Sequence, residues 1–401
     1  MRAYTLITAP DTPACHKARA YLRWRNVPFA EKAATALVLR SEVRPRLRRV
    51  DAPLLIAPDQ RAWSDTRMMF DALDGVLPGV PLRPEDVATE IETLILEAWL
   101  DQLVAPAAAF WLWSKDSRTA SKHLTGTAWP DRPATERERL GRMVRQQILA
   151  RFDRLGYRPD GLPAAENRIR TALAAAERVL EHSHFLFGTA PTAADCTLHA
   201  VLLTLRATPS HETFLTGRPA LNAWMQLMSG PIDPLRGRTH ASGRIPQALT
   251  ALVQLAAQEF IPIAIRAGTV TAEWADSHPG HPVLPPSFPD PSDPDPDHPN
   301  PRALRPADAW LLQRICSRIR SVEDFPSSTA RSTLDKLGLA DLRDFKPRRT
   351  IELRNFRFEL DMVPKQDQPV PDTVIRQVLL AMDKAGQDAA ATKDVVNLID
   401  P

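Results

Sequence analysis

The sequence predicts a small α+β domain, then an all-helical domain, then a C-terminal extension of mixed helices and strands. Short strands and capped helices alternate at the N-terminus, apolar residues then recur at helical spacing, and a stretch rich in Pro and Asp precedes the last hundred residues. We therefore expect domains over residues 1–78 and 85–275, a linker over 276–305 and an extension over 306–401.

The composition is that of an ordinary soluble globular protein. A net charge of +3 on 401 residues gives no broad field for nucleic acid or an anionic membrane, so we expect neither as a partner. Three scattered cysteines, Cys15, Cys196 and Cys316, are too few for a disulfide framework or a zinc site, and we expect no metal. We find no apolar run as long as a membrane span and no signal-peptide core, which favours a cytoplasmic protein.

The N-terminal domain begins with a strand over Tyr4–Thr8 and a loop that leads to Thr12. Thr12 and Pro13 open a helix, because threonine is a preferred N-cap residue and proline suits the first helical position. Asn26 is a plausible left-handed stop for that helix. A further strand, Ala52–Ile56, contains a proline near its start.

A second helix of this domain carries Met68, Met69 and Leu73 and is capped by the run Ser64–Thr66. Helical periodicity then dominates, with apolar faces over 87–103, 140–152 and 169–180.

Another helix carries apolar residues over 249–256, and Pro262 should end or kink it. In the extension we expect a helix from Ala309, strands over 349–354 and 357–362, and a last helix over 374–382. The extension carries no chemistry that we can identify. We expect it to pack on the helical domain or to contribute to a subunit interface.

The most informative stretch is Gly188–Leu198, because it contains a capping box. Thr192 can accept a hydrogen bond from the amide of Asp195, while the Asp195 carboxylate reaches back to the cap. The helix that follows is apolar on almost all sides, which predicts a buried central helix. We therefore assign Thr192 and Asp195 a structural role.

The pattern Gly-x-x-Pro-Thr-x-Ala-Asp-x-x-Leu in Gly188–Leu198 resembles the capped helix in the C-terminal domain of the glutathione transferase superfamily. The first domain looks like the thioredoxin-type domain of that superfamily, and Arg218–Trp224 is similar to its late Pro-x-Leu-x-x-Trp pattern. The resemblance covers roughly the first 230 residues. It implies a thioredoxin-like glutathione-binding domain, glutathione as a co-substrate and a homodimer.

The resemblance also implies a catalytic residue. Thr12 occupies the reactive position at the start of the first helix, where a hydroxyl or thiol meets the glutathione sulfur and helix amides stabilise a thiolate. Threonine can donate a hydrogen bond to that thiolate but cannot form a mixed disulfide. Cys15 takes the second, usually inward-facing, cysteine position. A plain helix cap is an equal alternative for Thr12.

Two more elements would hold glutathione. Ala52 and Pro53 fit the cis-proline dipeptide whose preceding backbone pairs with the cysteinyl part, although many thioredoxin-like domains keep this proline for architecture alone. Asp65 would pair with the γ-glutamyl ammonium, and Thr66 with helix amides would hold its carboxylate. The alternative is helix capping by Ser64 or Asp65.

The superfamily commonly has a basic residue before the proline dipeptide, but this chain has Asp51 there. Arg49, or its neighbour Arg48, is the candidate for the glycyl carboxylate. On the helical domain, Phe110, Trp111 and Trp113 could line a second-substrate pocket, and the alternative is core packing.

These residues indicate a glutathione transferase-like protein that adds the glutathione thiolate to a small apolar electrophile. One alternative is a catalytically silent binding or assembly module of the same fold. Another is a different glutathione-dependent enzyme, such as an isomerase, lyase or dehalogenase.

Overall fold

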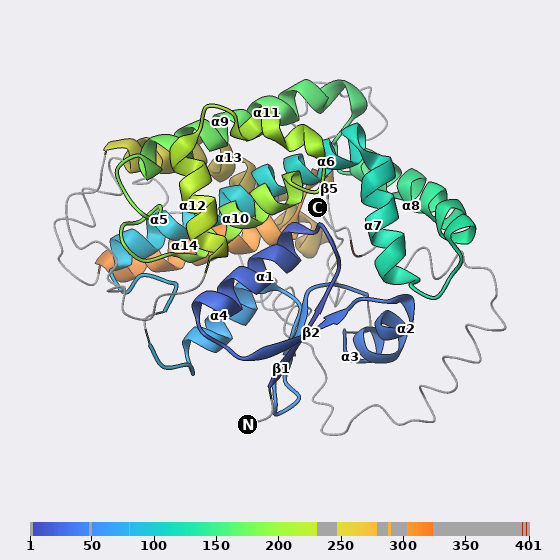
Figure 1. Cartoon of the computed structure of the whole chain (residues 1–401). Helices are drawn as coiled ribbons and strands as arrows, with labels where there is room; N and C mark the ends of the chain where they lie inside the picture. The colour runs from blue at the N-terminus through green and yellow to red at the C-terminus, as the bar shows by residue number, and fades with distance from the viewer. Residues whose placement is uncertain are drawn as a thin grey trace.

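The computed structural model describes residues 3–47, 50–79, 81–230, 247–278, 288–289 and 303–323, together with Val395 and Leu398. A small mixed sheet with its helices is followed by a largely helical domain (Figure 1). The predicted fold class, a thioredoxin-like α+β domain before an all-α domain, is confirmed.

The first domain is built on a four-stranded sheet of order β2-β1-β3-β4. The strands are β1 (Tyr4–Thr8), β2 (Phe29–Ala33), β3 (Leu54–Ile56) and β4 (Ala62–Trp63). β1 pairs in parallel with β2, and the β1–β3 and β3–β4 pairs are antiparallel. The helices are α1 (Pro13–Trp24), α2 (Ala36–Val38), α3 (Arg44–Leu47) and α4 (Thr66–Asp74).

Local sequence signals set the ends of α1 and the start of α4. Thr12 is the N-cap residue of α1, Pro13 takes the first helical position, and Asn26 adopts a left-handed φ of 52° just after the helix. These predicted boundaries are confirmed. Asp65 caps α4, because its carboxylate accepts hydrogen bonds from the amides of Arg67 and Met68.

The helical domain begins with α5 (Val87–Trp99), which a π-helical turn over Leu100–Val104 joins to α6 (Ala105–Lys115). It continues with α7 (Ser117–Ala128), α8 (Ala134–Arg154), α9 (Leu162–Leu180), α10 (Ala193–Leu205), α11 (Glu212–Leu215) and α12 (Pro219–Ser229). Helix α10 packs against α1 of the first domain and against α5 and α6 of its own. It is therefore the helix on which the two domains meet.

The predicted capping box is present at the start of α10, and its carboxylate has further partners. Asp195 accepts hydrogen bonds from the Thr192 amide at 2.8 Å and the Thr192 hydroxyl at 2.9 Å. It also accepts from the Leu186 amide at 3.0 Å and from Trp224 Nε1 of α12 at 3.1 Å. One buried side chain thus joins the loop before α10, α10 itself and α12. Burial raises the pKa of Asp195 although these donors oppose the shift.

Helix α13 (Gln247–Ser277) continues through Pro262, so the proline does not end the helix. An interior proline costs about 3 kcal/mol because it removes a hydrogen bond and crowds the preceding turn. The apolar side chains that follow, including Ile263, Ala264 and Ala267, are buried. Their packing outweighs the local cost.

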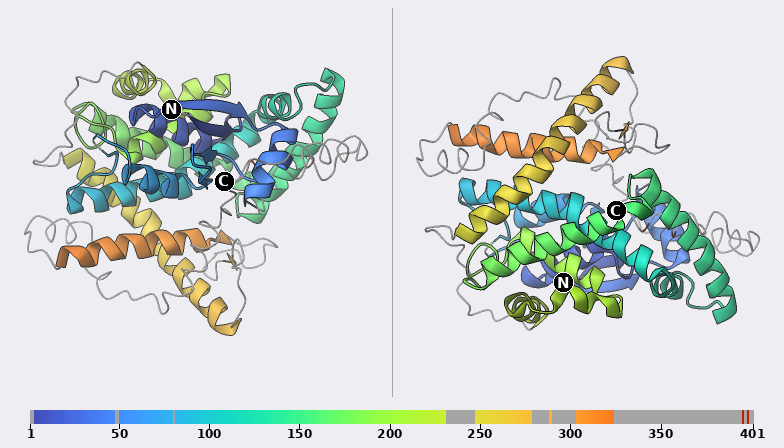
Figure 2. Two further views of the ribbon diagram at one scale, coloured as in Figure 1. Left: turned by 90° about the horizontal axis from the view of Figure 1, so that it is seen from below. Right: turned by 90° about the horizontal axis from the view of Figure 1, so that it is seen from above.

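The described part of the extension packs on the helical domain, which was one of the two expected placements. Helix α14 (Pro306–Glu323) begins three residues before the expected Ala309 and lies against α5 and α13. Figure 2 shows α13 and α14 crossing one another in a layer on the α5 side of the molecule. In the expected linker, β5 (Phe288–Pro289) pairs with β6 (Ala303–Leu304).

The strands expected over 349–354 and 357–362 and the helix expected over 374–382 lie outside the described residues. The expectation that no apolar run reaches the length of a membrane span needs correction. By length and composition, two described helical stretches reach it: Val87–Lys115 and Gln247–Trp274. The most apolar window of the first is 94% buried, so packing within the protein accounts for it. The window of the second is 50% buried, and this helix packs on α5, α9 and α14.

Replacing Asp195 with alanine should lower the free energy of unfolding by about 3 kcal/mol or more, because several buried donors lose their acceptor at about 1–3 kcal/mol each. Denaturant titration measures this loss. Thr192→Ser is the matched control, since serine keeps the hydroxyl donor, and it should cost less than about 1 kcal/mol. A similar small loss in Asp195→Ala would contradict the central role of this carboxylate.

Candidate functional site

The sheet register brings two of the predicted elements together. β1 and β3 are antiparallel neighbours, with Ile7 opposite Leu54. The start of β3 therefore lies beside the end of β1, where the chain continues toward α1. As a result, Pro53 is placed beside the loop that leads to Thr12.

The third predicted element reaches the same end of the sheet. β3 and β4 are also antiparallel, with Leu55 opposite Trp63. The end of β4 therefore lies beside the start of β3, and the cap residue Asp65 follows directly. The N-termini of α1 and α4 thus flank Pro53, as the resemblance requires.

The peptide bond between Ala52 and Pro53 is cis, as the resemblance implied. Both residues are buried. Within the described residues, the backbone amide and carbonyl of Ala52 make no hydrogen bond. An extended peptide laid beside the dipeptide could pair with this backbone as a further strand does.

The Thr12 side chain is turned inward. Its hydroxyl donates a hydrogen bond to the Ala9 carbonyl at 3.2 Å, and the residue is 4% exposed. Thr12 is the N-cap residue by its backbone, since the His16 amide donates to its carbonyl, but its side chain makes no capping bond. The hydroxyl would have to turn away from Ala9 to meet a bound sulfur.

Cys15 faces inward, as expected for its position. The residue is fully buried, and its Sγ accepts a hydrogen bond from the Ala9 amide at 3.3 Å. Burial raises the pKa of the thiol, although the Thr12 hydroxyl opposes the shift. A buried thiol with a raised pKa is a poor nucleophile, so this residue does not suit a one-cysteine mechanism.

Asp65 is engaged by its own chain. Arg67 donates to it from Nε at 3.2 Å and from Nη2 at 2.5 Å, in addition to the two amides that it caps. Burial alone would raise the pKa of Asp65, but Arg67 and the amide of Met68 outweigh it and hold that pKa well below its usual range. The capping alternative is thus confirmed for Asp65, and Thr66 beside it is buried.

Beneath the site, buried charges join the two domains. Lys17 of α1 donates to Glu97 of α5 at 2.7 Å and to Asp101 at 2.5 Å. Burial would raise the pKa of Glu97, but Lys17 and Arg83 lower it to about 2. This contact fixes α1, and with it Thr12, against the helical domain.

The remaining predicted residues lie elsewhere. Arg49 and Arg48 are outside the described residues, so no placement of a glycyl contact follows. Asp51 lies close enough to Cys15 to contribute to the raised pKa of that thiol.

The three predicted pocket residues of α6 pack in the core. Phe110, Trp111 and Trp113 are each 2% exposed. Phe110 contacts the rings of Phe152 and Tyr157, and Trp111 packs edge to face on Phe214. This is the core-packing alternative, and these rings do not line an open surface.

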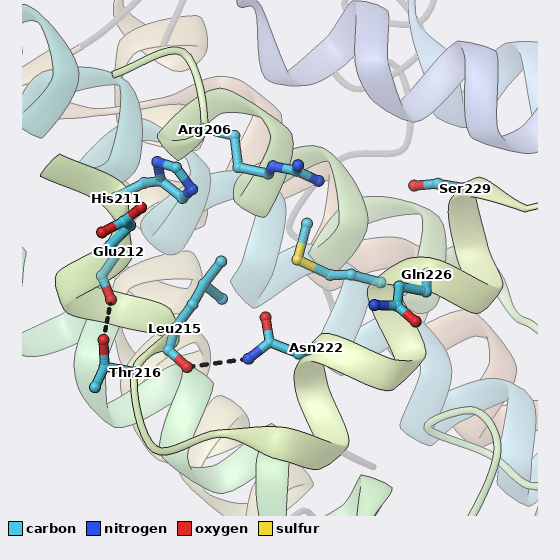
Figure 3. A pocket seen from close by; sticks show the side chains of 9 residues that line it. Arg206, His211, Glu212, Leu215, Thr216, Asn222, Gln226 and Ser229 are labelled. Atoms are coloured by element: carbon cyan, nitrogen blue, oxygen red, sulfur yellow. Dashed lines mark hydrogen bonds between the residues drawn. The ribbon is translucent and has the colours of Figure 1, made fainter. Parts of the chain in front are cut away.

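A cavity of about 470 Å³ lies between the end of α10, α11 and α12 (Figure 3). The side chains of Arg206 and His211 lie along one side of it, and the amides of Asn222 and Gln226 along another. Ser229 also lines the cavity, and its carbonyl accepts a hydrogen bond from Arg23 at the C-terminal end of α1. The cavity is therefore separated from the Thr12 end by the length of α1.

Sequence reasoning missed Lys17 and Arg67, the charged partners at the site. Lys17 stands one turn before the buried Tyr21 on α1, and a lysine there hints at a buried ion pair. Its partner Glu97 is 80 positions away and gives no local signal. Arg67 stands two positions after Asp65, where a pairing with that carboxylate could have been considered.

Comparison with known proteins gives one family match. The family model described as the glutathione S-transferase C-terminal domain matches residues 143–227. No curated protein matches the chain.

Several solved structures are similar to this chain. A glutathione S-transferase from Rhodospirillum rubrum is 19% identical with a TM-score of 0.39, and the match covers 62% of this chain and 99% of that one. The β-etherase LigF from Sphingobium sp. is 18% identical with a TM-score of 0.45, covering 63% and 100%. A glutathione S-transferase from Methylobacterium radiotolerans, in complex with glutathione sulfonate, is 17% identical with a TM-score of 0.40, covering 57% and 91%.

Glu97 should make stability depend on pH. Its pKa is lowered in the folded state from an ordinary 4.5 to about 2, so its contribution is complete above pH 4.5 and is lost as the pH falls toward 2. Glu97→Gln should therefore lose less unfolding free energy than the unaltered protein between pH 7 and pH 3, as measured by urea titration.

The exposed Glu138 provides the matched control, and Glu138→Gln should keep the full acid loss. If Glu97→Gln and the unaltered protein lose stability in parallel, the ion pair with Lys17 does not lower the pKa of Glu97 in the folded protein.

Proposed function

We propose that this chain, a member of the glutathione S-transferase superfamily by its matched C-terminal domain and its thioredoxin-like first domain, binds glutathione and adds its thiolate to a small apolar electrophile. The binding site would lie at the end of the sheet where the N-termini of α1 and α4 flank Pro53. Glutathione acts there as a co-substrate.

The unpaired backbone of Ala52 is the observation that carries this proposal. Its amide and carbonyl stand before the cis-proline with no hydrogen bond from the described residues. Buried backbone groups are nearly always paired in folded proteins, so an amide and a carbonyl left without partners before the cis-proline suit an extended ligand. The cysteinyl part of glutathione offers the matching amide and carbonyl.

The chemistry proposed for this site is electrostatic activation of a bound thiol. The thiol would lie at the N-terminus of α1, where helix amides favour a negative charge. Thr12, once turned from Ala9, would donate a hydrogen bond to the thiolate, and the thiol proton would pass to solvent. The thiolate would then attack an electrophilic carbon and form a carbon–sulfur bond; an aryl halide would lose its halide ion, and a substrate that undergoes addition would take a proton from solvent. Most of the rate gain would come from placement and charge.

The two ends of the tripeptide have separate proposed partners. Asp65 would pair with the γ-glutamyl ammonium, while the Thr66 hydroxyl would meet its carboxylate at the N-terminus of α4. The superfamily commonly has a basic residue before the proline dipeptide, but this chain has Asp51 there. Arg49 would therefore be the residue that meets the glycyl carboxylate.

A catalytically silent binding or assembly module is the second candidate. The inward hydrogen bond of Thr12 to Ala9 and its low exposure favour it, since a thiol partner should be free to meet the sulfur.

Membership of the superfamily also supports a homodimer in the cytoplasm as part of the proposal.

Calorimetric titration with reduced glutathione tests binding. We expect a dissociation constant between micromolar and millimolar, and a clear loss of affinity in Asp65→Asn, because asparagine keeps a capping oxygen but removes the charge that pairs with the ammonium. Asp59→Asn, at an exposed loop position, should bind as the unaltered protein does. Equal affinity in Asp65→Asn would rule out the proposed contact.

Turnover distinguishes the two candidate functions. With glutathione and an activated aryl halide, Thr12→Ala should reduce kcat/KM by about 10²-fold, the size expected for loss of one donor to a developing charge. Thr12→Ser should retain most of the activity, because it keeps the hydroxyl. Binding without turnover in the unaltered protein would favour the silent module.

A further inference from the structure

Helix α14 of the extension reaches the proposed γ-glutamyl end of the site. Trp310 lies over the guanidinium of Arg67, with Cζ 5.3 Å from the ring centroid. The guanidinium of Arg314 packs on the same ring at 5.7 Å. Trp310 is thus held between two cations and is 9% exposed.

Two ion pairs fasten α14 in this position. Arg314 donates to Asp71 of α4 at 2.7 Å, and Arg318 donates to Glu90 of α5 at 2.9 Å. One contact lies on each domain, so α14 bridges the helix that begins at Asp65 and the first helix of the helical domain.

Under Trp310, the groups that would receive the ligand are already engaged or covered. The Asp65 carboxylate accepts two hydrogen bonds from the Arg67 side chain and two from backbone amides. The side chains of both residues are 10% exposed. An ammonium group that pairs with Asp65 would compete with Arg67 for this carboxylate.

Arg67 has one donor to spare. Its Nη1 is buried and has no hydrogen-bond partner among the described residues. An unpaired buried guanidinium donor is costly, and it suits a carboxylate that arrives at this place. The γ-glutamyl group carries such a carboxylate beside its ammonium.

We propose that α14 is an autoinhibitory cover: Trp310 holds Arg67 on Asp65, and the γ-glutamyl group binds there only when α14 moves off α4. In the open state Arg67 turns its Nη1 to the ligand carboxylate and leaves an oxygen of Asp65 to the ammonium. The inference rests on the proposed glutathione site. It gives the extension a regulatory task, since whatever displaces α14 would raise glutathione affinity.

Calorimetric titration of full-length variants with reduced glutathione tests the cover. Trp310→Ala should bind roughly ten-fold more tightly than the unaltered protein, a factor within the range of a partly buried cation–π contact. Arg314→Gln should change affinity in the same direction, because it removes the Asp71 anchor and one of the two cations. Trp310→Phe keeps an aromatic face and should stay close to the unaltered protein.

Trp274→Ala is the matched tryptophan control. Trp274 stacks on His278 at the far end of α13 and should leave affinity unchanged when removed. Thermal unfolding of each variant shows whether the fold is kept.

The outcomes separate the two proposals. If Trp310→Ala binds glutathione more tightly than the unaltered protein, or if only the variant binds it, both the glutathione site and the autoinhibitory cover are supported. If the unaltered protein binds glutathione and Trp310→Ala binds it equally well or more weakly, the proposed autoinhibitory role of α14 is wrong. The proposed glutathione site then still holds. If neither protein binds glutathione, the site itself fails, and the cover fails with it.

Discussion

The buried carboxylate of Asp195 is the interaction on which the rest of the structure depends. It collects four donors, from the loop before α10, from the cap residue Thr192 and from Trp224 of α12. With these donors a charge can stand in the core at an acceptable cost, because each lone pair has a partner. The carboxylate thereby fixes α10, and α10 is the surface on which α1 of the first domain packs.

Beyond α10, ion pairs between helices fix the position of the proposed site. Lys17 joins α1 to Glu97 and Asp101 of the helical domain, so the N-terminus of α1 has a defined position relative to α5. Arg67 holds Asp65, and α14 lies over that pair through Trp310. Paired charges of this kind cost desolvation energy and are weak evidence of stability, but they specify one arrangement of helices. At this site the specified arrangement keeps the proposed γ-glutamyl end occupied by the chain itself.

Sequence reasoning succeeded where the physical cause is local. The start of α1 at Pro13, the left-handed Asn26 and the Thr192–Asp195 box all depend on residues within one helical turn. The cis bond at Pro53 came from the family resemblance, since sequence alone favours trans.

Sequence reasoning failed where the interacting residues are distant in the chain or where packing overrides local conformational preference. The pairing of Lys17 with Glu97 and the contact of Trp310 with Arg67 have no local pattern. Pro262 shows the second cause, because burial of the following turns keeps α13 continuous through it. The α6 aromatics Phe110, Trp111 and Trp113 show it again, since their residue types suit either a pocket or a core, and burial assigns them to the core.

A crystal structure of the full chain grown with reduced glutathione tests the central claim most directly. The account predicts the tripeptide extended along the Ala52 backbone with its γ-glutamyl end at Asp65 and α14 displaced. Glutathione bound elsewhere, such as in the cavity beside Arg206, would contradict it.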